Sequence, residues 1–169
     1  MKSGWLLLLL LLVGGGRARP RSSPGKKGKK KKDSEAARQE RVLDTLVWTR
    51  SAAVKYGVPL PIVLAVLDVE SHGYPEATSG VGAMGYMQLM PDTVKTYRPH
   101  GGADPYDPAT NIDIGVHLLS DLYNEFGDWL AVFTAYNAGP ARLRKNRHNY
   151  RWVYVNEVLA RLQIWQNTR

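Results

Sequence analysis

The fold of this chain is decided by residues 62–91, which read IVLAVLDVESHGYPEATSGVGAMGYMQLMP. Residues 62–69 are apolar on nearly every side of a helix, so they are predicted to form a central, buried helix. The last turn of that helix carries a carboxylate, Glu70, and a glycine-rich stretch follows it. Because burying an unpaired carboxylate is costly and shifts its pKa, Glu70 must be paired, exposed or used in chemistry.

The predicted position of Glu70 favours a protonated carboxyl group. Burial disfavours the ionised form, and the negative end of the helix dipole lies beside it, so both effects raise the pKa. A carboxyl that stays protonated near neutral pH is what a general acid requires. Asp68 projects from roughly the opposite side of the helix, and helical geometry alone does not choose between the two carboxylates. Glu70 is nearer to the loop that would form a cleft.

The glycine-rich stretch after this helix has a composition suited to a ligand-binding wall. Its glycines let the backbone approach a ligand closely, and they are Gly80, Gly82 and Gly85. Ser79 and Gln88 offer hydrogen bonds, while soft apolar surface comes from Met84, Met87 and Met90. A loop that closes on the core, with the methionines as filling, explains the same composition equally well.

Helical periodicity recurs along the rest of the chain and predicts an all-α fold of five or six helices in a single domain. The predicted helices are one from Asp33 or Ser34 to Gly57, one from Pro61 to about Ser71, a short one from Pro91, one from Asp107 to Gly127, one from Asp128 to the NAGP at 137–140, and one through Val155–Trp165. No clear alternating strand pattern occurs, although residues 78–87 have room for a small β-hairpin.

The charges of the chain are distributed unevenly. Of the 23 Lys and Arg residues, ten lie in residues 1–32, which hold no acid. Residues 33–169 carry the other 13 against all 15 Asp and Glu, a formal charge of −2, so the net charge of +8 comes from the N-terminus. A nucleic-acid partner would depend on that stretch alone, and none is expected. The absence of cysteine excludes disulfides, zinc–thiolate sites and a lipid-modified N-terminal cysteine.

The N-terminus has the pattern of a secretory signal peptide over residues 1–18. A lysine precedes nine apolar residues, Trp5–Val13, and small residues follow at cleavage-site spacing. A membrane anchor is the alternative, but a membrane-spanning helix needs about 20 apolar residues. Residues 19–33 are predicted to be a basic, disordered linker, either a spacer or an electrostatic tether. We therefore expect an exported protein of the periplasm or cell envelope, folded over residues 34–169.

Three motifs in order make the chain similar to a known family. The first is Glu70-Ser71 with Ser79 nine residues after the glutamate, and the second is GYMQLMP at Gly85–Pro91. The third is the segment 107–140, which holds an Asn-Ile-x-x-Gly helix and ends in Ala-Tyr-Asn-Ala-Gly-Pro. Over about residues 60–145 the chain thereby resembles the lytic transglycosylases with the soluble, goose-type-lysozyme-like catalytic domain. The resemblance implies a single lysozyme-like helical domain.

The resemblance also implies a role for each matching position. Glu70 would be the sole catalytic acid and base, and no cofactor or metal is implied. The residues lining the cleft near the scissile bond would be Ser79, Gln88, Met90 and Tyr136, with Asn137 supporting that wall. The family's late Glu-Thr-x-x-Tyr-Val motif is matched only at Tyr154-Val155. Tyr150 and Arg151 stand where Glu-Thr would, so the chain departs from the family there.

The implied reaction cleaves the β-1,4 bond between N-acetylmuramic acid and N-acetylglucosamine in peptidoglycan, with a 1,6-anhydromuramic product. One carboxyl suffices, because the C6 hydroxyl of the same sugar attacks C1 in place of water. A muramidase that admits water and a non-catalytic peptidoglycan-binding scaffold are the alternatives. Peptidoglycan is the expected partner, either in general wall remodelling or in the service of an envelope-spanning secretion or motility apparatus. Stable membrane insertion is not expected.

The remaining polar candidates favour structural explanations. The histidines are scattered without metal-ligand spacing, and they are His72, His100, His117 and His148. Three aspartates lack the spacing of an EF-hand loop, namely Asp104, Asp107 and Asp113. The basic, aromatic stretch at residues 142–152 is expected to be a solvated face rather than a patch for anionic glycan or stem peptides.

Overall fold

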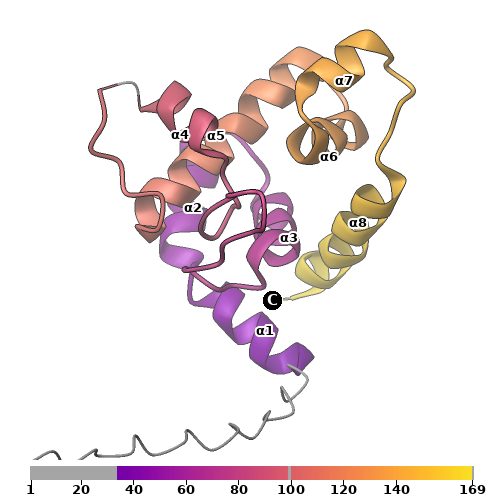
Figure 1. The fold of residues 1–169 in the computed structure, drawn as a ribbon. Helices are drawn as coiled ribbons and strands as arrows, with labels where there is room; N and C mark the ends of the chain where they lie inside the picture. The colour runs from indigo at the N-terminus through magenta and orange to yellow at the C-terminus, as the bar shows by residue number, and fades with distance from the viewer. Residues whose placement is uncertain (1–33, 99, 169) are drawn as a thin grey trace, which may run out of the picture. The chain divides into compact units, whose positions relative to one another are not determined.

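The structure is a computed structural model that describes residues 34–98 and 100–168 (Figure 1). The predicted signal peptide, 1–18, and the predicted linker, 19–33, lie outside the described residues. The described part contains eight helices and no β-strand, so the all-α prediction is confirmed. The helices are α1 Glu35–Leu43, α2 Leu46–Tyr56, α3 Leu60–Ser71, α4 Pro91–Tyr97, α5 Pro108–Phe126, α6 Trp129–Ala138, α7 Pro140–Lys145 and α8 Trp152–Asn167.

The predicted single helix from Ser34 to Gly57 is wrong, because the chain turns at Asp44 and Thr45 and forms two helices, α1 and α2. The buried Thr45 hydroxyl donates to the carbonyl of Val42 at 2.7 Å, and the Thr45 N–H donates to the same oxygen at 3.1 Å. Such local side-chain bonds compete with helix continuation. The turn lets α1 contact α3 while α2 packs on α5.

The predicted number of five or six helices is too low for a second reason, which is α7. The NAGP segment ends α6 as predicted, but Gly139 takes a positive φ of 81° and Pro140 then starts a new helix. A proline is favoured in the first turn because its missing N–H has no helical partner there. Leu143 anchors this short helix, since its side chain is fully buried.

The predicted helix ends rest on capping residues, and the structure confirms them. Ser34 Oγ accepts from the N–H of Ala37 at 3.2 Å. Asp107 and Asp128 cap α5 and α6 in the same way, with distances of 2.8 Å to Thr110 N and 3.1 Å to Ala131 N. Gly57 and Gly127 end α2 and α5 in the left-handed conformation, which glycine adopts without steric cost.

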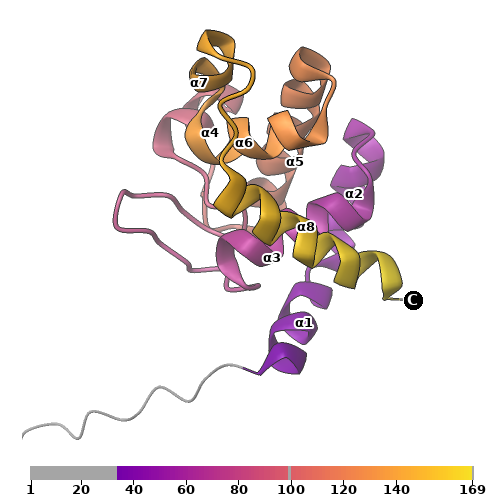
Figure 2. The ribbon, with the colours of Figure 1, turned by 90° about the vertical axis from the view of Figure 1, so that its right-hand side faces the viewer.

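The central helix predicted from the apolar run is α3. Every residue from Ile62 to Asp68 is buried, and α3 packs against α8, α2 and α1. Figure 2 shows α8 running across α3. The helix ends at His72, which takes a left-handed conformation with φ 54°. Glu70 therefore stands in the last turn of the most buried helix, as predicted.

The small β-hairpin for which residues 78–87 had room is reduced to two isolated antiparallel bridges, Thr78 with Met84 and Met84 with Leu89. Backbone hydrogen bonds within the loop, such as those between Met84 and Leu89 at 2.9 and 3.0 Å, are joined by side-chain bonds from outside it. The buried amide of Asn111 accepts from Met87 N at 2.7 Å and donates to Met84 O at 3.0 Å. Asn111 thus fastens the loop to α5.

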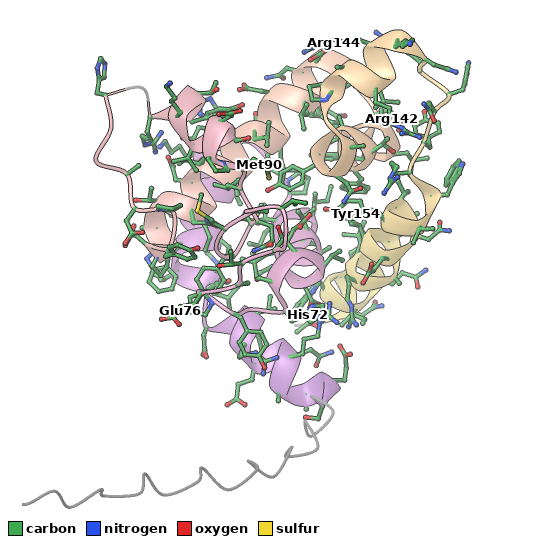
Figure 3. The ribbon with its side chains drawn as sticks, viewed as in Figure 1. His72, Glu76, Met90, Arg142, Arg144 and Tyr154 are labelled. Carbon is green, nitrogen blue, oxygen red and sulfur yellow. The ribbon has the colours of Figure 1, made fainter. Side chains whose placement is uncertain are left out.

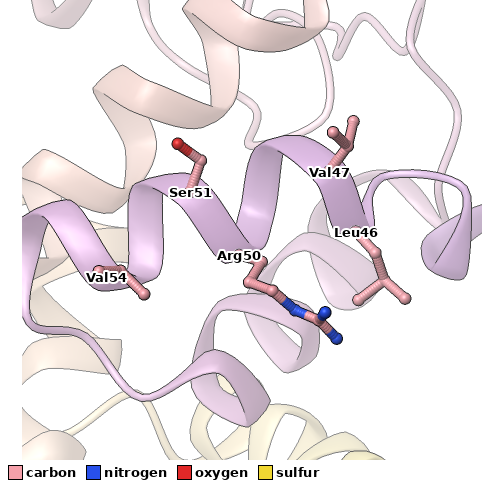
Figure 4. A pocket seen from close by; sticks show the side chains of 5 residues that line it. All are labelled: Leu46, Val47, Arg50, Ser51 and Val54. Atoms are coloured by element: carbon pink, nitrogen blue, oxygen red, sulfur yellow. The ribbon is translucent and has the colours of Figure 1, made fainter.

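The apolar positions of α2 are only partly used by the core. Val47 is 69% exposed and Val54 is 80% exposed, although both fit the helical pattern that predicted this segment. With Leu46, Arg50 and Ser51 they line an open hollow of about 530 Å³ on the outer side of α2 (Figure 4). Helical periodicity alone therefore overestimated the buried face of this helix.

Candidate active site

The predicted catalytic carboxyl, Glu70, is mostly buried and contacts a tyrosine on the last helix, α8. The O–H of Tyr154, which Figure 3 labels on α8, donates to Glu70 Oε1 at 2.5 Å. Burial raises the pKa of Glu70 to about 7, while the hydrogen bond from Tyr154 opposes this rise and the charge of Glu157 adds to it. A carboxyl with this pKa is part protonated near neutral pH and can both give and take a proton.

Tyr154 is a suitable partner because it stays protonated. Its side chain is buried, and burial together with the charge of Glu70 raises the pKa of its hydroxyl well above the ordinary value. The hydroxyl is therefore always available as a donor to Glu70. Such a donor stabilises the ionised carboxylate more than the protonated carboxyl.

Tyr136 connects this carboxyl to the glycine-rich loop. Its O–H donates to the carbonyl of Met87 at 2.8 Å, which ties α6 to the loop. Burial and then the charge of Glu70 raise the pKa of the Tyr136 hydroxyl. The structure thus brings Glu70, Tyr136 and the GYMQLMP loop together.

Ser79 and Gln88 use part of their hydrogen-bonding capacity within the loop. Ser79 Oγ accepts from Ala83 N at 2.9 Å, and Gln88 Nε2 donates to the carbonyls of Ala77 at 2.9 Å and Gly85 at 3.0 Å. Gln88 also holds a positive φ of 46°, which is uncommon for a residue other than glycine. Within residues 34–98 and 100–168, the Ser79 hydroxyl hydrogen and the Gln88 side-chain carbonyl have no partner, so both could serve a ligand.

Met90 and Asn137 lie at the ends of helices beside the loop and the tyrosine. Met90 precedes α4 and is 42% exposed (Figure 3). Asn137 is exposed in the last turn of α6, one residue after Tyr136. Their predicted roles need contact with a sugar, and their exposure is compatible with that contact.

The other carboxylate of α3, Asp68, has a different environment. It is fully buried, its Oδ1 accepts from Arg38 Nε, and its Oδ2 accepts from Trp165 Nε1 at 3.0 Å. A carboxylate that is enclosed and paired with an arginine cannot protonate a glycosidic oxygen. The geometry therefore favours Glu70, where the helical pattern alone left both carboxylates open.

The sequence prediction did not include Tyr154 among the site residues. The signal that could have found it was the Tyr-Val pair at 154–155, which matches the family's late motif. The departing residues beside it, Tyr150 and Arg151, attach the start of α8 to α6: Tyr150 O–H donates to Asp128 Oδ2 at 3.3 Å, and Arg151 N donates to Thr134 Oγ1 at 3.1 Å. They help to hold the helix that carries Tyr154.

The other polar candidates do not gather into a site. Asp113 pairs with Lys55 at 2.7 Å and with Arg98, and it accepts from Tyr56 at 3.0 Å. Groups of three or more His, Cys, Asp or Glu that could hold a metal ion do not occur among residues 34–98 and 100–168. Over the same residues, none of the helices has both the length and the hydropathy that a membrane span requires.

Comparison with known sequences places this geometry in a family. Residues 48–158 match the family model described as the transglycosylase SLT domain. A transglycosylase of Enterobacteria phage PRD1 is 42% identical over 89 residues, which cover 53% of this chain and 32% of that protein. Membrane-bound lytic murein transglycosylase C of Histophilus somni is 31% identical over 139 residues, or 73% of this chain and 38% of that protein.

The soluble lytic murein transglycosylase of Escherichia coli K12 is 41% identical over 96 residues, which cover 52% of this chain and 15% of that enzyme. The chain thus spans between 15% and 38% of the length of these curated relatives.

Solved structures agree with the sequence comparison. The 70-kDa soluble lytic transglycosylase of Escherichia coli superposes with a TM-score of 0.62 at 30% identity, covering 77% of this chain and 25% of that one. A glutamate-to-glutamine mutant of lytic transglycosylase Slt from Pseudomonas aeruginosa, described as inactive, gives a TM-score of 0.62 at 30% identity and covers 70% and 23%. These matches confirm the lysozyme-like helical fold that the resemblance implied. The chain therefore belongs to the transglycosylase SLT domain family.

Proposed function

We propose that this protein is a peptidoglycan lytic transglycosylase that cleaves the β-1,4 bond between N-acetylmuramic acid and N-acetylglucosamine and forms a 1,6-anhydromuramic product. The observation that carries the proposal is the state of Glu70, a mostly buried carboxyl whose pKa is raised to about 7 and whose partner is a tyrosine hydroxyl. Its place in the SLT domain, residues 48–158, supports the same reaction.

In the first step Glu70 acts as a general acid. Its proton passes to the glycosidic oxygen, the bond between that oxygen and C1 of muramic acid breaks, and N-acetylglucosamine leaves as an alcohol. Positive charge develops at C1, where the N-acetyl group of the same sugar stabilises it. The hydrogen bond from Tyr154 stabilises the carboxylate that Glu70 becomes.

In the second step the ionised Glu70 acts as a general base. It takes the proton of the C6 hydroxyl while that oxygen forms a bond to C1, and the 1,6-anhydro ring closes. Glu70 is protonated again and ready for the next cycle. Attack within one sugar gains from proximity, with effective molarities of about 10⁵ M or more for well-oriented groups, so no second carboxylate is needed to activate water.

The loop and α6 supply the sugar-binding wall in this proposal. Ser79 and Gln88 would orient the sugar through the hydroxyl and the side-chain carbonyl that the loop leaves free, and Met90 would pack against it. Tyr136 fixes the loop to α6 through Met87 and so sets the distance between this wall and Glu70. Asn137 would extend the wall from the end of α6.

The decisive experiment digests purified sacculi with the wild-type domain and with Glu70→Gln, and analyses the released sugars by mass spectrometry. The wild type is expected to release muropeptides one water lighter than hydrolysed ones, and Glu70→Gln is expected to fold and release none. Release of hydrated muropeptides would make the protein a muramidase. Binding to sacculi without any release would make it a scaffold module, and full turnover by Glu70→Gln would refute the assignment of the catalytic residue.

We further propose that the protein is exported and works on the peptidoglycan of the periplasm or cell envelope, either in general remodelling or beside an envelope-spanning secretion or motility apparatus. The signal-peptide pattern of residues 1–18 supports export. Fractionation of cells that produce the full chain tests this: we expect the processed protein in the periplasmic fraction, and an uncleaved cytoplasmic protein would contradict it.

A further inference from the structure

We infer that Asp68 is a positioning residue: it holds one side of the α3–α8 crossing, fixes the angle at which α8 crosses α3, and so keeps Tyr154 in place on Glu70. The inference rests on the proposed function of Glu70 and assigns a role to a buried cluster that the reaction itself does not use. The cluster consists of Asp68 with Arg38, Arg161 and Trp165, and we call it the Asp68 clamp.

The Asp68 clamp joins three helices through a fully buried carboxylate and two arginines whose side chains are 12% and 18% exposed. Arg38, on α1, donates from Nε to the Asp68 carboxylate and from Nη2 to the Asp68 carbonyl at 2.7 Å. From α8, Trp165 Nε1 donates to Oδ2 at 3.0 Å, and Arg161 Nε lies 3.8 Å from the same oxygen. Arg161 also forms an ion pair with Glu35 on α1 at 2.5 Å, so the carboxylate of Glu35 compensates the positive charge of Arg161.

The two carboxylates of α3 hold α8 at two separate points. Residues two apart on a helix point about 200° away from each other, so Asp68 and Glu70 face opposite sides of α3. Their partners on α8, Trp165 and Tyr154, are 11 positions apart, which is three turns or about 16 Å and returns to the same helix face. Because α8 runs across α3, as Figure 2 shows, one hydrogen bond lies on each side of the crossing.

Two contacts between α8 and α3 fix the angle at which the helices cross, whereas a single contact would let α8 pivot about it. Each contact on α8 is about 8 Å from the middle of the crossing, so a tilt of about 7° displaces the backbone at Tyr154 by about 1 Å. A displacement of that size is enough to break a 2.5 Å hydrogen bond to Glu70. In an enzyme, misplacing a group by about 1 Å can cost about 100-fold in rate.

The clamp draws on parts of the chain outside the matched family domain. The family model covers residues 48–158. Arg38 lies before this range, and Arg161 and Trp165 lie after it. The N-terminal α1 and the last turns of α8 therefore meet on a residue two positions from Glu70. This explains why charged groups are enclosed at that place, since an apolar cluster could fill the space but would not fix one orientation as well.

The charged and titratable groups around both carboxyls define what the test must separate. Glu70 faces Tyr154 and Glu157 from α8 and Tyr136 from α6. Asp68 faces the clamp from α1 and α8, and the ring of His72, where its own helix ends, has Nδ1 2.7 Å from the Asp68 carbonyl. The direct effect of the clamp on Glu70 is therefore mechanical, through α8, and Tyr154 carries it.

The test replaces Trp165 by Phe, which removes the N–H donor and keeps an aromatic ring. The matched control is Trp129→Phe. Trp129 is a partly buried tryptophan at the start of α6, and its ring stacks on that of Tyr123 in α5. The pKa of Glu70 is measured without substrate by carbon-13 NMR titration of labelled glutamate side chains, with Glu70→Gln identifying the signal. The values of kcat and KM on sacculi are then measured for each folded variant.

We expect Trp165→Phe to raise the pKa of Glu70 by about 0.5 unit, because a weakened bond from Tyr154 stabilises the carboxylate less. We expect kcat to fall about tenfold with little change in KM. In a Tyr154→Phe background the same replacement should move the pKa no further, since the clamp acts through Tyr154.

Three results would overturn the inference: a Glu70 pKa unchanged from wild type, a shift that adds to that of Tyr154→Phe, or equal effects of Trp165→Phe and Trp129→Phe. Should the wild type itself lack turnover, the proposed function fails, while the NMR titration still decides whether the clamp positions Tyr154.

Discussion

Replacing Glu70 by Gln should stabilise the domain at alkaline pH while abolishing turnover. The pKa of Glu70 is raised from 4.5 to about 7 by burial, so the folded state prefers the protonated carboxyl. A raised folded-state pKa gives a contribution that is complete below the unfolded value near 4.5 and is lost as the pH rises through 7. Above pH 7 the wild-type domain therefore contains a buried, ionised carboxylate, which lowers the free energy of unfolding.

The size of this effect follows from the shift. A rise of about 2.5 units at 1.36 kcal/mol per unit amounts to about 3 kcal/mol as an upper value. Glutamine has the same shape and no charge, and its amide oxygen can still accept the hydrogen bond from Tyr154. We therefore expect Glu70→Gln to match the wild type in free energy of unfolding near pH 4 and to exceed it by about 2–3 kcal/mol near pH 8.

Urea unfolding of both proteins at pH 4, 6 and 8, followed by tryptophan fluorescence, measures this difference. Glu76→Gln serves as the control, because it makes the same change at an exposed glutamate in the loop after α3 (Figure 3). An advantage of Glu70→Gln that does not grow with pH, or a loss of stability at pH 8, would refute the argument that Glu70 is held protonated by burial.

Further predictions concern the partner of Glu70 and the loop. Tyr154→Phe removes the hydrogen bond that lowers the pKa of Glu70, so that pKa should rise by about 1–2 units. The alkaline limb of kcat/KM, measured by sacculus clearance from pH 5 to 10, should move to higher pH with it. A shift to lower pH would contradict this prediction. Gly85→Ala should destabilise the domain by about 3 kcal/mol or more in thermal unfolding, because its φ is 74° and a Cβ would lie 2.4 Å from Asn111 Nδ2; a change under 1 kcal/mol would show that the loop can yield. Asn111→Ala should cost about 3 kcal/mol in urea unfolding, since it leaves the buried Met87 N–H without its acceptor at 2.7 Å, and a near-neutral result would mean that water replaces the amide.

The local chemistry of the sequence determined where most helices begin and end. The caps at Asp107 and Asp128 and the stop at Gly127 depend only on neighbouring residues, and the structure agrees with each. The apolar run before Glu70 predicted the central helix, because a helix that is apolar on all sides must be buried in the core. The break at Thr45 was missed, since one hydroxyl bond outweighed a helical pattern that continued across it.

Only the tertiary structure decided which partners each carboxylate of α3 meets. Glu70 and Asp68 are two positions apart in the same helix, and no local rule separates them. Their partners, Tyr154 and Trp165, come from a helix more than 80 residues later in the chain, and the angle at which α8 crosses α3 selects which carboxylate each one reaches. A crossing angle results from the packing of whole helix surfaces, so it cannot be read from the spacing of residues along one helix.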